Sequence, residues 1–224
     1  MNLLDLEQGG PEWRQARAGS LGASAIHDVV AKTKSGWAAS RANRMATLVI
    51  EHLTGFPVAT FQTAAMAEGV EREPMARSMY EFMTNVTVEQ IGMSVHPTIG
   101  GTHASPDGLV GADGLLEIKC PQPAQHLATL LGEAIPSKYM LQMYWQMRCC
   151  DRLWCDFVSF NPDFPPSMQI FIKRVKRDDD LIRELETEVT AFLNELRETV
   201  DRLRAKYEPA TRETDEAVLA LMAG

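Results

Sequence analysis

The stretch "ASPDGLVGADGLLEIKCP", residues 104–121, constrains the fold of this chain more than any other segment. Its apolar and polar residues alternate with the two-residue period of a β-strand, and glycines mark the turns. We therefore expect a hairpin whose second strand is "GLLEIKC", residues 114–120. Because residues i and i+2 of a strand face the same side, Glu117 and Lys119 should point together, while Ile118 points the other way, into the core.

Asp107 lies just before the hairpin turn, where it can sit across from Glu117 and Lys119. Two carboxylates that converge on one point repel each other unless a cation joins them. Oxygen ligands without cysteine or histidine favour a hard ion such as Mg²⁺ or Mn²⁺, and a lysine beside that ion can hold or deprotonate a water. The stretch therefore predicts a metal site suited to phosphodiester hydrolysis. The alternative interpretation is a charge pair on a half-exposed strand.

Helical and strand periods alternate along the rest of the chain. Apolar spacing predicts helices over residues 24–32, with Ser24 near its cap, 40–55, 63–84, interrupted or kinked near Gly69 and Pro74, 137–150 and 178–207. Strand-like alternation is found in 85–97, "RLWCDFVSFNP" and "MQIFIKRV". This order predicts an α/β fold with a central mixed β-sheet flanked by helices and a long C-terminal helix. We expect a single domain over residues 1–207 and a tail over 208–224.

Composition argues against several classes of protein. The net charge of −8 argues against a protein that coats nucleic acid by charge alone. No apolar run approaches the roughly 18 residues of a spanning helix, and the N-terminus does not resemble a signal peptide, so we expect a cytoplasmic protein without a membrane partner. No two cysteines form a C-x-x-C pair, and none precedes Cys120, where an iron–sulfur nuclease would need one. We expect neither zinc nor an iron–sulfur cluster.

The segment "SPDGLVGADGLLEIKCP" resembles the P-D…(D/E)-x-K motif of restriction-endonuclease-like folds, and more closely that of the phage lambda exonuclease family of viral recombination nucleases. Three further segments resemble motifs of this family in the same order: "EWRQARAGSLGASAIHDVVA", "AEGVEREPMARSMYE" and "SKYMLQMYWQM". The resemblance covers roughly residues 10 to 200, and the motif at 105–121 is its specific part.

The resemblance implies roles for individual residues. The metal ligands would be two carboxylates and a backbone carbonyl, and the catalytic lysine lies beside them: Asp107, Glu117, Ile118 and Lys119. Glu73 matches a helix glutamate near the metals and is a candidate ligand for a second one, with an exposed helix acid as the alternative. Gln142 matches a catalytic glutamine on a buried helix, where a satisfied core amide is the alternative.

Arg17, Ser24 and Ser105 match the family's pocket for a 5′-terminal phosphate. A guanidinium binds phosphate in a fork, and a helix start offers free N–H groups. The alternatives are a surface salt bridge for Arg17 and a plain helix cap for Ser24. The chain departs from the family at Gly22, where lambda exonuclease has a hydroxyl residue, and at Pro97, which occupies an acidic position near the second metal.

Taken together, the resemblance implies an Mg²⁺-dependent exonuclease, with Mn²⁺ as a substitute, that digests the 5′-ended strand of linear double-stranded DNA. It implies 5′-to-3′ polarity, 3′ overhangs for recombination by strand annealing, a processive ring-shaped homotrimer, and a phage-type single-strand annealing protein as partner. Trp37, among basic residues, is a candidate for stacking on DNA bases. The alternatives are a sequence- or structure-specific endonuclease of the same fold and a catalytically silent module that binds DNA ends.

Overall fold

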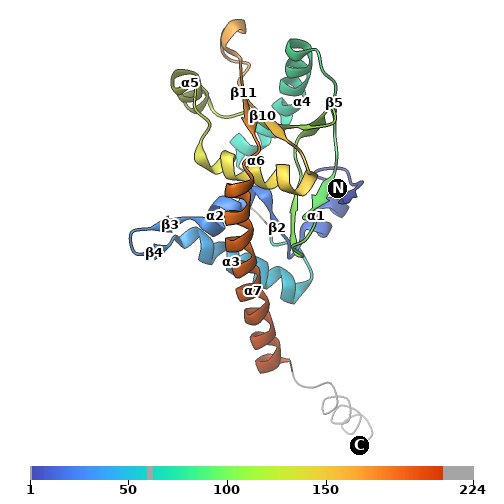
Figure 1. Cartoon of the computed structure of the whole chain (residues 1–224), viewed down its shortest axis with the longest axis vertical. Helices are drawn as coiled ribbons and strands as arrows, with labels where there is room; N and C mark the ends of the chain where they lie inside the picture. Colours follow the sequence, from blue (N-terminus) through green and yellow to red (C-terminus); the bar gives the residue numbers. More distant parts are fainter. Residues whose placement is uncertain (1, 60–62, 209–224) are drawn as a thin grey trace, which may run out of the picture.

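The computed structural model describes residues 2–59 and 63–208, which form helices, two larger β-sheets and a small hairpin that projects from the side of the molecule (Figure 1). The α-helices are α1 (Pro11–Arg17), α2 (Ile26–Val30), α3 (Ala39–Thr54), α4 (Ala64–Thr84), α5 (Pro123–Gly132), α6 (Ser137–Cys150) and α7 (Asp179–Tyr207), and the 3₁₀ turns are η1 (Ala23–Ala25) and η2 (Pro166–Met168). The strands are β1 (Asn2–Leu4), β2 (Leu21–Gly22), β3 (Lys32–Thr33), β4 (Gly36–Trp37), β5 (Val88–Glu89), β6 (Met93–Val95), β7 (Thr102–Ala104), β8 (Gly108–Val110), β9 (Gly114–Lys119), β10 (Trp154–Phe160) and β11 (Ile170–Lys176).

The larger sheet is mixed, as the sequence predicts, and has the strand order β11-β10-β9-β8-β5. Strands β9 and β10 are parallel, and the other neighbours are antiparallel. Parallel neighbours need a long crossover, which α5 and α6 supply. A second sheet, in the order β1-β6-β7-β2, was not expected, because its strands of two or three residues are too short to show a period.

The β8–β9 hairpin is confirmed, and β9 divides its side chains between two layers. Leu116 and Ile118 join the apolar cluster beneath α4, whereas Leu115 joins the larger core that includes residues of α6 and α7. Residues of one strand alternate between faces, so Glu117 and Lys119 lie on the same side as Leu115. The predicted direction of Ile118 is confirmed, and this alternation brings the two charges under α6.

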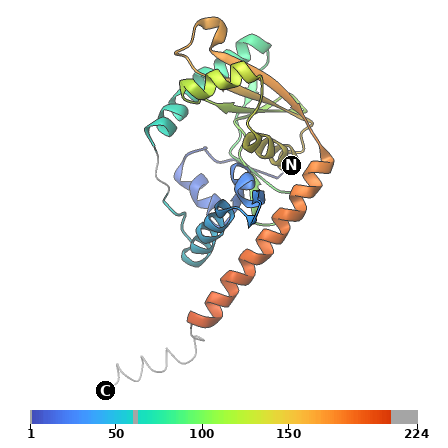
Figure 2. The same cartoon turned by 90° about the vertical axis from the view of Figure 1, so that its left-hand side faces the viewer.

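Helix α7 confirms the predicted long C-terminal helix. Its Asp178 cap accepts hydrogen bonds from the backbone N–H groups of Asp180 and Leu181, both at 3.1 Å. Its apolar stripe packs on the core, and the helix extends past the other elements (Figure 2). The rest of the predicted tail, residues 209–224, lies outside the described residues. Within the described ranges, no helix combines the length and apolar character needed to cross a bilayer.

The predicted helix over residues 24–32 is wrong at both ends. Residues 23–25 form the turn η1, and α2 ends at Val30 because Ala31 is extended, with ψ of 129°. The Ala38 N–H donates to the Ala31 carbonyl at 3.0 Å next to the β3–β4 hairpin. Ala25 is the N-cap of α2, so the interpretation of Ser24 as a helix cap is also wrong.

Two further expectations between residues 63 and 132 are corrected. Helix α4 is not interrupted at Gly69 or Pro74, because packing of its buried residues against the sheet holds it together despite the missing N–H of proline. The expected strand over 85–97 is split into β5 and β6, which belong to different sheets. Between them, a Cβ at Gly92 would overlap the Leu6 carbonyl oxygen, so this close crossing requires glycine. Helix α5 was missed.

Candidate active site

The hairpin holds Asp107 directly against strand β9. The Asp107 backbone N–H donates to the Leu116 carbonyl at 3.1 Å, and Asp107 Oδ2 accepts a hydrogen bond from the Ile118 N–H at 2.5 Å. These two bonds fix the carboxylate beside the strand that carries Glu117 and Lys119. The spatial arrangement expected for the three charges is therefore present.

Glu117 is buried, with 1% of its surface exposed, and both of its carboxylate oxygens have partners. Lys119 Nζ forms an ion pair with Glu117 Oε1. From α6, Gln142 Nε2 donates to Oε1 at 2.7 Å and Gln146 Nε2 donates to Oε2 at 2.6 Å. A buried carboxylate needs such donors, and two glutamines one helical turn apart provide them. Gln142 is thus a satisfied amide whose partner is the candidate metal ligand itself.

Gln146 is a residue that the sequence analysis missed. Its spacing of four from Gln142 puts both amides on one face of a helix, and that was the available signal. The function of this face of α6 depends on its position over Glu117, where both amides donate to the carboxylate.

The charges of this group do not cancel. Burial raises the pKa of Asp107 well above its usual value, and the nearby carboxylates of Glu117 and Glu73 raise it further, against the opposing effect of Lys119. Burial alone would lower the pKa of Lys119, but the Glu117 and Asp107 carboxylates raise it above the ordinary lysine value. Lys119 is therefore an ammonium ion at neutral pH, and the carboxylates around it favour an additional cation.

Helix α4 contributes Glu73, which forms an ion pair with Arg77 one turn away at 2.5 Å. Glu73 is therefore not simply an exposed acid, and Arg77 is a second residue that the sequence analysis missed. The signal was again the spacing of four within a helix. Cys120 lies close by, and burial together with the Glu73 and Asp107 carboxylates raises the pKa of its thiol to about 12. It is therefore an uncharged thiol at neutral pH.

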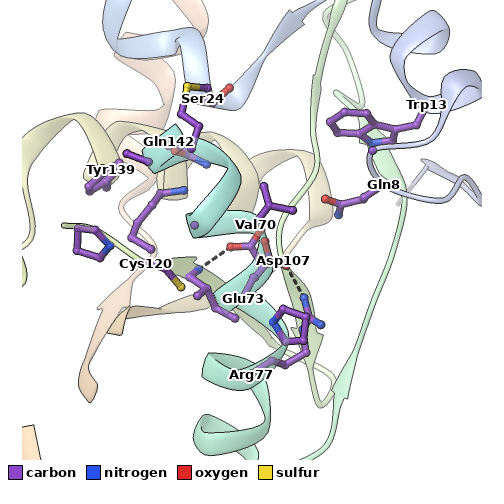
Figure 3. Close-up of a pocket in the computed structure, with 18 of the residues that line it drawn as sticks. Gln8, Trp13, Ser24, Val70, Glu73, Arg77, Asp107, Cys120, Tyr139 and Gln142 are labelled. Atoms are coloured by element: carbon purple, nitrogen blue, oxygen red, sulfur yellow. Dashed lines mark hydrogen bonds and ion pairs between the residues drawn. The ribbon is translucent and has the colours of Figure 1, made fainter. Parts of the chain in front are cut away.

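A cleft of about 1180 Å³ brings most of the predicted catalytic residues together. Figure 3 shows Glu73, Asp107, Gln142 and Ser24 around a common space, although they come from α4, the segment before β8, α6 and η1. Ile118 and Lys119 of β9 also line it.

A smaller pocket of about 130 Å³ unites the three residues predicted to bind a terminal phosphate, Arg17, Ser24 and Ser105. It adjoins the cleft, because Ser24 and Gln142 line both. The Trp13 indole N–H donates to Ser105 Oγ at 3.2 Å, and the Arg17 guanidinium lies 3.9 Å from the centre of the Trp13 ring. The hydrogen bond of the Arg17 Nε–H goes to His103, so a surface salt bridge does not describe this arginine.

Trp37 lines neither the cleft nor the small pocket. It lies on the β3–β4 hairpin with 44% of its surface exposed, and Lys32 and Arg41 stack on its ring at 4.5 and 4.2 Å. Its predicted contact with DNA remains a prediction.

The oxygen donors of the cleft fit a hard cation, although they do not form a complete side-chain cage. Within the described residues, no three histidine, cysteine, aspartate or glutamate side chains gather closely enough to hold a metal by themselves. Burial, together with the neighbouring Glu117 and Glu73 carboxylates, nevertheless raises the pKa of Asp107. Mg²⁺ commonly binds one or two carboxylates and completes its shell with other oxygens and water, so Asp107, Glu117 and the Ile118 carbonyl suit it.

Comparison with known proteins agrees with this geometry. The YqaJ-like viral recombinase domain matches residues 12–152. The alkaline exonuclease LHK-Exo from Laribacter hongkongensis, also solved in complex with dAMP, is 47% identical, with a TM-score of 0.83 over 88% of this chain and 97% of that one. A phage-related exonuclease from Haemophilus somnus 129PT shares the fold, with 15% identity and a TM-score of 0.68 over 82% and 96% of the two chains.

Among curated proteins, the uncharacterized protein R354 of Acanthamoeba polyphaga mimivirus is 26% identical over 184 residues. The match covers 76% of this chain but only 32% of the mimivirus protein. The chain thus spans about a third of the length of this relative.

Proposed function

Since this chain belongs to the YqaJ-like viral recombinase family, we propose that it is an exonuclease that digests the 5′-ended strand of linear double-stranded DNA in the 5′-to-3′ direction. Its 47% identity to an alkaline exonuclease supports nuclease chemistry. The products would be mononucleotides and a duplex with a 3′ single-stranded overhang.

The observation that carries this proposal is the adjacency of the small pocket and the cleft. A 5′-terminal phosphate held by Arg17, Ser24 and Ser105 would leave the next phosphodiester in the cleft beside Asp107, because Ser24 and Gln142 border both spaces. Holding the end and the reacting bond together in this way favours exonucleolytic cleavage. That LHK-Exo was solved with dAMP, a nucleoside 5′-monophosphate, supports a product of this class.

In this proposal, Asp107, Glu117 and the Ile118 carbonyl would hold Mg²⁺ or Mn²⁺, and Glu73 would lie near a second ion. The bound ion would supply Lewis-acid stabilisation of the charge that develops on the scissile phosphate. Gln142 and Gln146 hold the Glu117 carboxylate in place by hydrogen bonds to its two oxygens. Lys119 positions the attacking water and faces the negative charge that develops on the phosphate.

Further proposals rest on family membership. They are a single nuclease domain over residues 1–207, action as a ring-shaped, processive homotrimer around DNA, delivery of the overhang to a phage-type single-strand annealing protein, and a role in phage recombination in the bacterial cytoplasm. A net charge of −8 is compatible with such a ring when the basic residues line its bore.

The test compares three DNAs incubated with the protein and Mg²⁺: a linear duplex with 5′-phosphates, the same duplex with 5′-hydroxyls, and a closed circle. We expect rapid loss of the phosphorylated linear DNA, slower loss of the hydroxyl form, an untouched circle, and no cleavage in EDTA. Asp107→Asn is the inactive control, and strand-specific end labels report polarity.

Each competing function gives a different pattern in this assay. Nicking or linearisation of the circle would identify an endonuclease of the same fold. Binding of ends without cleavage of any DNA, with Mn²⁺ also present, would identify an end-binding module. Either result would refute the proposed exonuclease.

A further inference from the structure

His103 on β7 lies behind Arg17 at the wall of the small pocket, with 1% of its surface exposed. The Arg17 Nε–H donates to His103 Nε2 at 3.0 Å, and His103 Nδ1 lies 2.8 Å from Ser20 Oγ. An arginine N–H can only donate, so Nε2 is the acceptor and the ring proton belongs on Nδ1, which donates to Ser20. Both ring nitrogens of His103 are therefore committed to this arrangement.

His103 is kept neutral, as this hydrogen-bond pattern requires. Burial and the neighbouring Arg17 charge lower the pKa of His103 to about 3. The neutral imidazole therefore remains a hydrogen-bond acceptor for Arg17 at neutral and alkaline pH.

Gly22 provides the room for the pair. Strands β2 and β7 are parallel, with Gly22 opposite His103. A Cβ at position 22 would lie 3.1 Å from His103 Nε2 and 3.2 Å from the Arg17 Nη2 atom, which is closer than an ordinary contact. The backbone of Gly22 is extended, with φ of −79° and ψ of 152°, so packing rather than backbone strain restricts this position.

The guanidinium is thus held on two sides. His103 binds its Nε–H edge, and the Trp13 ring covers one face at 3.9 Å. Among residues 2–59 and 63–208, no hydrogen bond engages the terminal Nη groups, and these are the groups that bind a phosphate as a fork.

We propose that His103 is a positioning residue that fixes Arg17 for the 5′-terminal phosphate, and that Gly22 is the small residue this arrangement requires. This inference rests on the proposed function and deepens it. Ordering one long side chain in advance is worth about tenfold in affinity.

The test measures binding of dAMP and of deoxyadenosine by calorimetry without metal, and KM and kcat on linear duplexes with 5′-phosphate or 5′-hydroxyl ends. His103→Ala should weaken dAMP binding about tenfold and raise KM for the phosphorylated end, with kcat and the hydroxyl end nearly unchanged. His103→Gln, whose amide oxygen can accept from Arg17, should recover most of the loss. In an Arg17→Gln background, His103→Ala should cause no further loss.

The matched control is His126→Ala. His126 is also fully buried with both ring nitrogens bonded, to Ser159 Oγ and the Met168 carbonyl, but it lines neither the cleft nor the pocket. It should lower the melting temperature without changing the preference for phosphorylated ends. A second substitution, Gly22→Thr, tests the same contact from the other side. It should impair phosphate binding in the wild type, where His103 lies against position 22, but improve it in His103→Ala, where the space left by the imidazole admits the threonine side chain.

Four outcomes would overturn the inference. If His103→Ala weakened the binding of phosphate and hydroxyl ends equally, His103 would be a packing residue. The same would follow if the loss of affinity from His103→Ala added fully to the loss from Arg17→Gln. A His103→Ala variant with unchanged dAMP binding, while Arg17→Gln loses it, would refute this inference alone. Wild-type protein that does not discriminate dAMP from deoxyadenosine would refute the phosphate pocket of the proposed function as well.

Discussion

Replacing Lys119 with methionine should destabilise the protein in a way that Mg²⁺ reverses. Glu117 is 1% exposed and the Lys119 side chain 26% exposed, so their ion pair is largely shielded from water. Removing one member of a buried pair costs about 3–5 kcal/mol, and we take the lower end because Lys119 reaches the cleft. Asp107, whose pKa is already raised by burial and Glu117, would lose its nearest compensating charge.

The assay is thermal and urea unfolding in EDTA and in saturating Mg²⁺. In EDTA, Lys119→Met should lose about 3 kcal/mol, or roughly 6–12 °C in melting temperature for a chain of this size. A ligand at a hundred times its Kd adds about 2.7 kcal/mol to the native state. Since the variant site is more negative, Mg²⁺ should stabilise Lys119→Met more than the wild type and restore most of the loss, while cleavage stays absent.

The control is Lys176→Met, an exposed lysine on β11, which should leave unfolding unchanged under both conditions. An equal loss for Lys119→Met with and without Mg²⁺ would show that the cation does not bind at these carboxylates. No loss in EDTA would show that Glu117 does not depend on Lys119, and cleavage at the wild-type rate would remove Lys119 from the mechanism.

Two further predictions concern other buried polar groups. Gln146→Leu should cost about 1–3 kcal/mol, because one Glu117 oxygen loses its 2.6 Å donor, and should weaken Mg²⁺ binding; a loss of stability without a change in calorimetric Mg²⁺ affinity would contradict this. Burial, helped by Arg148, lowers the pKa of His96 to about 4, and burial lowers that of His103 to about 3, so the unfolded chain binds more protons below about pH 6.5. The contribution of these histidines to the free energy of unfolding should therefore be fully present above pH 6.5 and fall as the pH drops, by up to about 1.4 kcal/mol per pH unit per histidine. When the free energy of urea unfolding is plotted against pH, His96→Gln should show a weaker dependence on pH than the wild type. An identical pH dependence would count against the lowered pKa of His96.

The sequence predicts the carboxylate hairpin well because a strand has an exact two-residue period. Once β9 is recognised, the shared face of Glu117 and Lys119 follows without knowledge of anything else in the molecule. Gln146 shows the limit of this reasoning. Its role depends on how α6 lies over β9, and no local pattern encodes that packing.

Contacts between distant segments were the hardest to anticipate. His103 and Arg17 are 86 positions apart in the chain, and strands β2 and β7, which bring them together, are two and three residues long. Such strands carry no readable period, so the second sheet and its histidine were both missed. Gly22 was noticed as a departure from the family, but only the structure gives its steric reason.

The spacing between phosphate pocket and carboxylates is set by a short, rigid piece of chain. Ser105 follows β7 of one sheet and Asp107 precedes β8 of the other, with only Pro106 between them. Proline restricts the backbone here, and the Pro106 carbonyl accepts a hydrogen bond from Gln8 Nε2 at 2.9 Å. Two residues of extended chain span about 6.6 Å, so the chain that links the small pocket to Asp107 is short. Under the proposed function, this short link between the two sheets sets the distance from the bound 5′-phosphate to Asp107, so each cut removes the same length of DNA.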